Sequence, residues 1–204
     1  MTSENNRAAG SALIIIDLQN DFLHPKGAYG RAGQTASDVA AVPGRLAPFA
    51  RALQSAGGLV VSTQFTLVPA KGGEPIISAD LKKHRSFLTR GDFEPGAWGS
   101  QLVDELQPAD LIIEKVAYSA FYMTRLEWCL RKCGIEKLWI AGIVTNGGVA
   151  STVRDAHVRD FHTTVLEDGC AAFSPQAHET TIASLRNLVP VMTVSDAARA
   201  LTGK

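Results

Sequence analysis

The chain has 204 residues, 46% of them hydrophobic, and its 20 basic and 20 acidic side chains give a formal net charge of zero. This length suits one domain with a sizeable hydrophobic core, so residues 1–204 are treated as a single domain. The balanced charge creates no field that would attract nucleic acid or a membrane surface, and the expected partners are a small-molecule substrate and further copies of the chain.

The first residues and the cysteines indicate a cytoplasmic protein. Residues 1–10 are polar and are expected to form a flexible N-terminus, and the apolar run that follows ends at Asp17, too soon for a signal peptide or a membrane span. The chain has 3 cysteines, none of them in a CxxC pair. This pattern argues against a disulfide framework and a structural zinc site.

Short β-branched runs alternate with longer stretches of helical period, which is typical of βαβ units and a parallel sheet. The predicted strands are Ala12–Ile16, Leu59–Thr63, Leu111–Ile113, Leu138–Ile143, Thr163–Leu166 and Val191–Val194. The predicted helices lie near 39–56, 101–106, 124–133, 148–159, 176–187 and 196–201. This alternation predicts a three-layer α/β/α domain with an open, mostly parallel six-stranded, Rossmann-like sheet.

Asp17 directly follows the apolar end of the first strand. Ligands of such sheets collect at the carboxyl ends of the strands, so its carboxylate is placed where a substrate binds. Partial desolvation there raises a carboxyl pKa unless a cation pairs with it. Aspartate is also a common cap or turn residue after a strand, and Asp17 alone leaves both roles open.

The segment from about 67 to 99 is rich in glycine and proline and has weak periodicity. It is expected to be a long loop over the sheet edge that acts as a lid, because long loops in compact domains are often functional. Two of its arginines are Arg85 and Arg90, and a guanidinium group can hold a substrate carboxylate through two parallel hydrogen bonds. Solvation at the surface is nevertheless the commoner fate of such side chains.

Lys115 ends the third apolar run, at the same edge of the predicted sheet as Asp17. A lone lysine at a strand end is usually solvated, but an aspartate and a lysine together form a proton-handling pair. Further along, Thr124 and Glu127 have the spacing of a capping box before a helix that Gly134 ends. Ser174-Pro175 likewise indicates a helix start.

The fourth strand runs into a glycine-rich bend and then a helix, over residues 138–149. Backbone N–H groups at such a helix start can bind an anion or a developing oxyanion. A packing turn that needs small residues explains an isolated Gly-Gly equally well. A dinucleotide site is a poor alternative because no GxGxxG motif occurs, so no cofactor is predicted.

These strand ends lie within three longer motifs. They are Asp17-Leu18-Gln19-Asn20-Asp21-Phe22, then Lys115 with Tyr118-Ser119-Ala120-Phe121, then Gly142-Ile143-Val144-Thr145-Asn146-Gly147-Gly148-Val149. In order, spacing and strand context, they resemble the isochorismatase-like hydrolases. That family includes nicotinamidases, N-carbamoylsarcosine and ureidoacrylate amidases, and isochorismatases. The resemblance spans roughly residues 12 to 194 and implies a hydrolase with the fold predicted above.

In the amidases of this family, the resemblance implies an aspartate base, a lysine and a cysteine nucleophile. Asp17 and Lys115 match the first two, whereas the cysteine position holds Gly148. Covalent cysteine catalysis therefore cannot use this position, and the missing thiol is expected to leave space for water or a bulkier substrate. A non-proline cis peptide is implied at Ile143–Val144, with the Val144 and Gly148 N–H groups facing the substrate.

The remaining thiols are not expected to replace that nucleophile. Cys129 and Cys133 lie four residues apart on a predicted helix and are expected to be core thiols. Cys170 follows the fifth predicted strand and is expected to pack rather than react.

True isochorismatases also have glycine at the cysteine position and cleave a vinyl ether without a covalent intermediate. Gln64 matches a substrate-contacting glutamine of those enzymes. Against this, they usually carry histidine before the aspartate and an aromatic residue further on, where this chain has Ile16 and Asp21. The resemblance to isochorismatases therefore implies non-covalent hydrolysis of a small carboxylate-bearing vinyl ether. Water-mediated amide hydrolysis and an inactive ligand-binding relative remain the alternatives.

Aromatic residues near the three motifs are expected to supply an apolar wall for the substrate, although each is more often simple core. They are Phe22, Trp98, Tyr118 and Phe121. The segment after Gln64 lacks the Asp-x-His and additional histidine of the nicotinamidase metal site, so no metal is predicted. Relatives are commonly dimers or larger, so a homo-oligomer, dimer or tetramer, is expected.

Overall fold

The computed structural model describes residues 7–202, and a six-stranded sheet lies at its centre. The strands are β1 (Ser11–Ile16), β2 (Leu59–Phe65), β3 (Leu111–Lys115), β4 (Lys137–Ile143), β5 (His162–Ala171) and β6 (Val191–Met192). Their order is β3-β2-β1-β4-β5-β6, and every neighbouring pair is parallel. The predicted parallel sheet is confirmed.

β1 lies in the middle of this sheet, and all of its side chains are buried. Ile15 is in register with Ser62 of β2 on one side and with Ala141 of β4 on the other. A strand covered on both faces is apolar along its whole length, which explains the unbroken run that predicted β1. β3 forms an edge of the sheet, and there Ile112 is exposed while Ile113 is buried.

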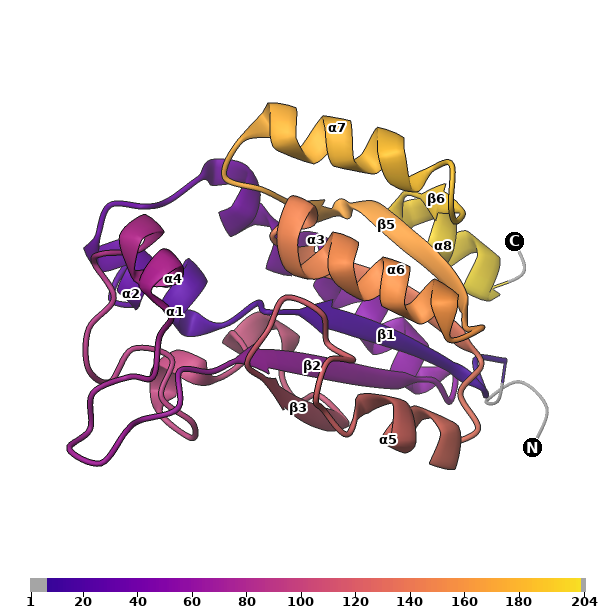
Figure 1. The fold of residues 1–204 in the computed structure, drawn as a ribbon. Coiled ribbons are helices and arrows are strands. Elements are labelled where there is room, and N and C mark those ends of the chain that lie inside the picture. Colours follow the sequence, from indigo (N-terminus) through magenta and orange to yellow (C-terminus); the bar gives the residue numbers. More distant parts are fainter. Residues whose placement is uncertain (1–6, 203–204) are drawn as a thin grey trace.

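Helices cover both faces of the sheet (Figure 1). α3 (Ser37–Ser55) and α8 (Val194–Thr202) pack together on one face, where both contact β5. α6 (Ala150–Val158) and α7 (Pro175–Leu185) contact β5 from the other face, and α5 (Leu126–Lys132) lies on their side of the sheet. The predicted three-layer α/β/α arrangement is confirmed.

Two predicted elements are shorter than expected. Residues 101–106 were predicted as a helix, but they contain only the 3₁₀ turn η2 (Asp104–Leu106). Leu102 instead forms an antiparallel bridge with Gln19, so the chain is extended there. The last strand was predicted to reach Val194, but it ends at Met192 because Thr193 caps α8, where its Oγ1 accepts a hydrogen bond from a backbone N–H at 3.1 Å.

The predicted start of α7 and the predicted end of α5 are confirmed. Ser174 caps α7, because its Oγ accepts from the Ala177 N–H at 3.4 Å, and Pro175 is the first helical residue. Gly134 follows α5 with φ of +67°, a backbone conformation that stops a helix and that glycine adopts without strain.

The predicted capping box at Thr124 and Glu127 is wrong. α5 begins at Leu126, and Thr124 Oγ1 accepts from the Leu126 N–H at 3.1 Å while it donates to the Ala120 carbonyl at 2.6 Å. Glu127 does not reach back to the helix start, because its carboxylate pairs with Arg159 of the α6 C-terminus at 3.0 Å. A tertiary ion pair has replaced the local cap.

Short helices gather beyond the carboxyl ends of β1 and β2 (Figure 1). They are α1 (Asn20–Leu23), α2 (Ala28–Arg31) and α4 (Ala79–His84), of which α4 belongs to the long segment 67–99. Of the expected flexible N-terminus, residues 1–6 lie outside the described residues, whereas Ala8 is buried and donates to the Ala56 carbonyl at 2.9 Å. Within residues 7–202, no helix is long and apolar enough to span a membrane.

The strand order reverses between β1 and β4. The chain builds outward from β1 through β2 to β3, and it then returns to place β4 on the other side of β1. A crevice opens at the carboxyl ends of the strands at such a reversal. Asp17 follows β1, Lys115 ends β3 and Gly148 lies just after β4, so the topology brings the three predicted residues to this crevice.

Candidate active site

A cavity of about 440 Å³ opens at the carboxyl ends of the central strands. Asp17, Lys115 and Gly148, which were predicted to carry the chemistry, all line it. The other lining residues are Phe22, Phe65, Ser78, Asp80, Leu81, His84, Arg85, Val116, Ala117, Tyr118, Ile143 and Val144. Its volume and its mixture of apolar walls with few charged groups suit a small organic molecule.

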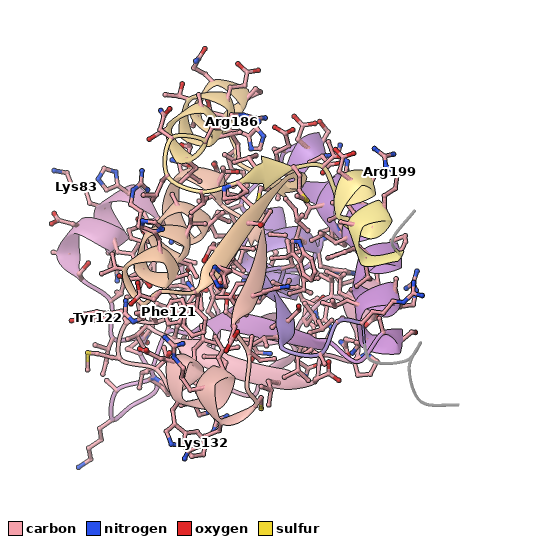
Figure 2. The ribbon with its side chains drawn as sticks, turned by 90° about the vertical axis from the view of Figure 1, so that its right-hand side faces the viewer. Lys83, Phe121, Tyr122, Lys132, Arg186 and Arg199 are labelled. Atoms are coloured by element: carbon pink, nitrogen blue, oxygen red, sulfur yellow. The ribbon has the colours of Figure 1, made fainter. Side chains whose placement is uncertain are left out.

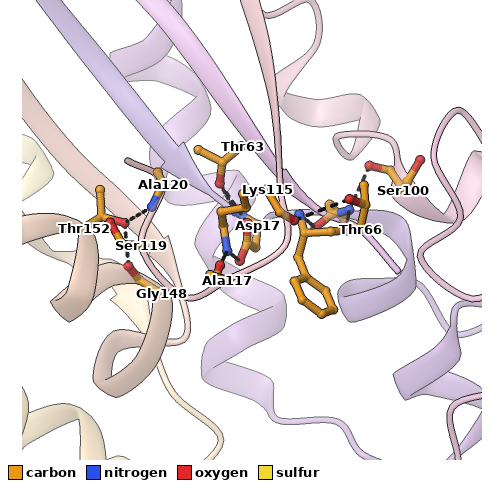
Figure 3. Close-up of polar contacts among 12 residues, drawn as sticks. Asp17, Thr63, Thr66, Ser100, Lys115, Ala117, Ser119, Ala120, Gly148 and Thr152 are labelled. Atoms are coloured by element: carbon orange, nitrogen blue, oxygen red, sulfur yellow. Dashed lines mark hydrogen bonds and ion pairs between the residues drawn. The ribbon is translucent and has the colours of Figure 1, made fainter. Parts of the chain in front are cut away.

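Asp17 and Lys115 form a buried ion pair at the base of this cavity (Figure 3). The Lys115 Nζ lies 2.6 Å from Asp17 Oδ2, and Thr63 Oγ1 donates to Asp17 Oδ1 at 2.8 Å. Lys115 Nζ also donates to the Ala117 carbonyl at 2.9 Å. Both carboxylate oxygens are therefore fixed by partners from two neighbouring strands, β2 and β3.

Burial raises the pKa of the Asp17 carboxyl above its ordinary value of 3.8, because a charged carboxylate is disfavoured away from water. The positive charge of Lys115 and the hydrogen bonds from Lys115 and Thr63 lower the same pKa without cancelling the effect of burial. Asp17 can therefore keep a proton at a higher pH than a surface carboxyl, as a general acid requires.

Gly148 faces this ion pair from the turn that precedes α6. A Cβ at position 148 would lie 3.4 Å from Asp17 Oδ2, so any side chain there would begin beside the carboxylate. The same Cβ would lie only 2.9 Å from Cγ2 of Ile16, which is fully buried on β1. The expectation that the missing thiol leaves free space needs correction, because the Ile16 methyl group fills part of that space.

The bend between β4 and α6 contributes backbone rather than side chains. The Ile143–Val144 peptide bond is cis, as the resemblance implied. Residues 145–149 form a π-helical turn, so α6 begins at Ala150 and not at the predicted position 148. Gly142 has φ of +120°, and a Cβ there would lie 2.2 Å from a backbone oxygen of β1, so the close approach of β1 and β4 requires glycine.

Thr152 of α6 connects this bend to the loop after β3 (Figure 3). Its Oγ1 donates to the Gly148 carbonyl at 2.7 Å and accepts from the Ala120 N–H at 3.0 Å. The same loop carries Ala117, which accepts from the Lys115 ammonium. One run of hydrogen bonds and covalent chain therefore links the backbone at Gly148 to the ion pair.

Gln64 was predicted to contact the substrate, but it does not line the cavity. Successive side chains of a strand point to opposite faces of the sheet. On β2, Thr63 reaches Asp17 and Phe65 lines the cavity, so Gln64 between them points away from it. Sequence reasoning missed Thr63 and Phe65, although the period of two along β2 was a signal that could have identified them.

The predicted aromatic wall is only partly present. Phe22 and Tyr118 line the cavity, as does Val144. Phe121 is buried elsewhere, with its ring centroid 5.8 Å from that of another core phenylalanine, Phe161. Trp98 is half-exposed and does not line the cavity, so neither Phe121 nor Trp98 forms part of the wall.

Asp21, which distinguished this chain from isochorismatases at the sequence level, has a structural role. Its Oδ1 accepts from the Ala28 N–H at 3.0 Å, and its Oδ2 accepts from the Phe93 N–H at 2.7 Å. The carboxylate thereby joins α2 to the long segment 67–99. Asp21 does not line the cavity, so its presence does not distinguish a vinyl-ether substrate from an amide substrate.

Two further residues of the first motif fix the same region. The fully buried Gln19 side chain donates to the Phe65 and Ser100 carbonyls, each at 3.0 Å, and accepts from the Phe65 N–H at 2.9 Å. Asn20 donates to the Trp98 carbonyl at 2.9 Å. Within this motif, Asp17 lines the cavity, while its polar neighbours hold the segments around it.

The three cysteines lie outside the cavity lining. Cys170 is buried, and burial raises the pKa of its thiol to about 12, so the reactive thiolate is suppressed. Cys129 is half-buried, whereas Cys133 is exposed. The prediction of two core thiols is therefore wrong for Cys133, which caps the C-terminus of α5.

The long segment supplies one wall of the cavity through α4 and its flanks. Leu81, His84 and Arg85 line the cavity, whereas Arg90 does not. Arg90 instead lies over the backbone of Gly73, where a Cβ would meet its guanidinium. In the part of the chain that the structure describes, no group of three or more His, Cys, Asp or Glu side chains is arranged to hold a metal ion.

Comparison with known proteins agrees with this geometry. A family model described as the isochorismatase domain matches residues 11–196. An isochorismatase-like hydrolase from Alkaliphilus metalliredigens superposes with a TM-score of 0.73 at 25% identity, covering 94% of this chain and 99% of its own.

Two more distant structures have the same fold. A cysteine hydrolase from Pseudomonas syringae pv. phaseolicola superposes with a TM-score of 0.81 at 19% identity, covering 100% of this chain and 99% of its own. N-carbamoylsarcosine amidase from Thermoplasma acidophilum superposes with a TM-score of 0.69 at 24% identity, covering 90% of this chain and 96% of its own.

Proposed function

This chain belongs to the isochorismatase family of hydrolases, and we propose that it hydrolyses a small carboxylate-bearing vinyl ether without a covalent intermediate. The observation that carries the proposal is the arrangement at the cavity base. A buried Asp17–Lys115 pair faces a glycine where a nucleophile would stand, and Ile16 fills part of the space that a nucleophile would need. The site keeps its means of moving a proton and has no side chain at this position to form a covalent bond.

Asp17 acts as the general acid. The π electrons of the enol ether take the carboxyl proton at carbon, which leaves an oxocarbenium-like centre next to the ether oxygen. Water adds to that centre and returns a proton to the Asp17 carboxylate. The resulting hemiketal gives up its hydroxyl proton as the bond to the departing oxygen breaks, that oxygen takes up a proton, and the products are a carbonyl compound and an alcohol. The raised pKa of Asp17 supports this role, because the acid must be protonated when substrate binds.

Lys115 orients the carboxyl group and stabilises its anion after the proton has left. Thr63 holds the other carboxylate oxygen, so the proton donor keeps one position through the cycle. In this proposal, the backbone N–H groups of Val144 and Gly148 bind the developing anion on the departing oxygen. Both residues line the cavity, which supports the assignment.

Substitution of Asp17 tests the proposal. Asp17→Asn keeps the shape of the side chain but carries no acidic proton, so we expect kcat on carboxylate-bearing vinyl ethers, isochorismate among them, to fall about 10²- to 10⁴-fold. Asp104→Asn, an exposed carboxylate outside the cavity, is the control and should retain full activity. Unchanged turnover of every accepted vinyl ether by Asp17→Asn would contradict the assignment.

The pH dependence of the wild-type enzyme gives a second test. Because the acid must be protonated, kcat should be full at low pH and should decline as pH rises through the raised pKa of Asp17. Measured kcat against pH on a vinyl ether therefore shows a falling limb that Asp17→Asn removes. A limb that rises with pH would indicate that Asp17 acts as a base.

The alternative reaction is water-mediated amide hydrolysis. In that reaction Asp17 acts as a base, so kcat would rise with pH. The likeness to N-carbamoylsarcosine amidase favours this second candidate. Product analysis on primary amides and N-carbamoyl acids separates the two reactions. An inactive relative, the remaining alternative, would bind carboxylates without turning over any compound of either panel.

The same proposal includes the setting in which the protein works. Three free cysteines, one of them exposed, support a reducing cytoplasm. Exposed apolar side chains on β3 and α5, such as Ile112 and Trp128, support a homo-oligomer, because association between copies would remove them from water. The zero net charge supports a small-molecule substrate rather than nucleic acid.

A further inference from the structure

A second cavity, of about 410 Å³, adjoins the first. The two share three lining residues, Arg85, Tyr118 and Val144, which stand at the junction between them. The second cavity extends from this junction toward the starts of α6 and α7, and its other lining residues are Asn146, Gly147, Ser151, Phe173, Ser174 and Ala177. The candidate active site is therefore one compartment of a longer, two-part space.

Arg85 is the charged residue at the junction. It follows α4, is half-buried, and its guanidinium carbon lies 5.8 Å from the centre of the Tyr29 ring. Among residues 7–202, no side-chain carboxylate forms an ion pair with this guanidinium. The ring contact orients the group from one side and leaves its N–H donors available to a bound anion.

The first cavity is lined by other charged side chains, and their contacts differ from those of Arg85. Lys115 Nζ is held by Asp17 Oδ2 at 2.6 Å and by the Ala117 carbonyl at 2.9 Å, so it is committed to orienting the proton donor. Asp80 also lines the cavity, but it lies in the first turn of α4 and forms no ion pair with Arg85 in the described part of the chain. An anionic group on the substrate therefore finds its available guanidinium at the junction, away from the reacting carboxyl.

The two compartments differ in chemistry. Phe22, Phe65 and Leu81 give the first cavity an apolar wall beside the proton donor. The second cavity offers Asn146 and Ser151, whose side chains form no hydrogen bond within the described part of the chain. Polar groups of this kind, without protein partners, can bind a hydroxyl or an amide of a ligand.

We propose that the substrate has two arms that meet at a carboxylate, with an apolar unsaturated arm in the first cavity and a hydroxylated arm in the second. Arg85 binds the carboxylate at the junction, and Ser151 and Asn146 bind the hydroxylated arm. This inference rests on the proposed function for the bond that is cleaved and for the unsaturation of the first arm, whereas the division into an apolar and a polar arm follows from the two cavities. Arg85 and Ser151 are specificity residues under this proposal.

Binding of matched probes to the intact protein tests the carboxylate assignment. N-benzoyl-L-serine carries an apolar ring, a carboxylate and a hydroxymethyl arm, and N-benzoyl-L-serinamide lacks only the charge. By calorimetry, we expect the wild-type protein to bind the carboxylate about 10-fold more tightly than the amide. Arg85→Gln should abolish this preference by weakening the carboxylate and leaving the amide unchanged.

Lys83→Gln provides the matched control for charge. Lys83 is an exposed residue of α4 that lines neither cavity and projects outward at the edge of the molecule (Figure 2). The substitution Lys83→Gln removes one positive charge two residues from Arg85. Because Lys83 does not line either cavity, this variant should keep the preference for carboxylate. An equal loss of preference in Lys83→Gln and Arg85→Gln would show a general charge effect and overturn the assignment.

A third probe, N-benzoyl-L-alanine, tests the second compartment because it lacks only the hydroxyl of N-benzoyl-L-serine. The wild-type protein should bind the serine compound about 3- to 10-fold more tightly, and Ser151→Ala should remove this difference without weakening the alanine compound. No difference in the wild-type protein, or one that Ser151→Ala preserves, would overturn the two-arm assignment.

These measurements separate this inference from the proposed reaction. Binding requires no turnover, so preserved probe preferences with no hydrolysis of any vinyl ether or amide would contradict the catalytic proposal alone. Conversely, an active enzyme that binds none of the three probes at millimolar concentration would contradict the two-arm inference alone. A circular dichroism spectrum that matches that of the wild-type protein shows, for each variant, that a lost preference does not reflect unfolding.

Discussion

The contact between Ile16 and position 148 gives a prediction at the scale of single residues. Because a Cβ at 148 would lie 2.9 Å from a buried methyl group, Gly148→Cys should destabilise the fold by about 1–3 kcal/mol through overpacking. Ile16→Ala removes that methyl group, so the added cost of Gly148→Cys should disappear in the double variant. Chemical denaturation of the four proteins in this cycle measures the coupling.

Ile14→Ala is the matched control for that cycle. Ile14 is equally buried on β1 and is not among the nearest atoms to the added Cβ, so its effect should add to that of Gly148→Cys without coupling. Additive free energies for Ile16→Ala as well would show that the neighbouring structure relaxes around the new side chain. The Ile16 contact would then not explain the absence of a side chain at this position.

The site residues differ in how far the sequence could predict them. The places of Asp17, Lys115 and Gly148 were predictable because each lies at or shortly after the carboxyl end of a strand, and the topology of a parallel sheet brings such positions together. The Ile16 contact was not predictable, because a change of a few tenths of an ångström in the spacing between β1 and the turn before α6 decides whether a Cβ at 148 fits. Gln19 and Asp21 were equally hidden, since their partners, such as Phe65 and Phe93, are distant in sequence.

At the scale of elements, Thr152 is a positioning residue that joins α6 to the loop after β3. Thr152→Val removes the hydroxyl that links the Gly148 carbonyl to the Ala120 N–H, and leaves both backbone groups without this partner. We expect kcat to fall about 10-fold, with KM less affected, because the backbone facing Asp17 is no longer held in place. Steady-state kinetics on the accepted substrate measures this split.

Two comparisons distinguish positioning from general stability. Thr152→Ser keeps the hydroxyl and should restore kcat. Thr163→Val removes a hydroxyl from a similarly buried threonine on β5, which donates to the Phe161 carbonyl outside the cavity, so it should lower stability and leave kcat unchanged. Similar loss of kcat in the Thr152 and Thr163 variants would mean that kcat follows stability alone.

The elements themselves were predictable in proportion to their burial on both faces. β1 and β4 are central, and their apolar runs identified them without help from tertiary contacts. The short helices α1 and α2 were not predicted, because they are only one turn long and are held by polar contacts such as that of Asp21. At the start of α5 the sequence predicted a capping box that does not form, because the Glu127 carboxylate pairs with Arg159 of another helix end.

At the scale of the whole molecule, the exposed surface predicts self-association. The edge formed by β3, the following loop and α5 exposes large apolar side chains, among them Ile112, Met123 and Trp128. Burial of such side chains between copies provides the hydrophobic driving force for a homo-oligomer. We expect sedimentation velocity to show a dimer or larger species, and Trp128→Glu to shift the population toward monomer.

Ile76→Glu is the control for this shift. Ile76 and Trp128 are similarly exposed, at 65% and 64%, but Ile76 belongs to the long segment 67–99 on another part of the chain. Its substitution should leave the sedimentation coefficient unchanged. A wild-type protein that sediments as a monomer at every concentration would contradict the proposed assembly.

The contact between Ile16 and Gly148 also limits the order in which mutations can accumulate in a lineage. On the predicted cost of Gly148→Cys, a variant that gains a cysteine at 148 while Ile16 remains starts with lower stability than its parent. A smaller residue at 16 must come first, and that change alone opens a cavity in the core and has its own cost. If the predicted coupling holds, a thiol at position 148 is best tolerated together with a second substitution at Ile16, a residue with no part in the proposed reaction.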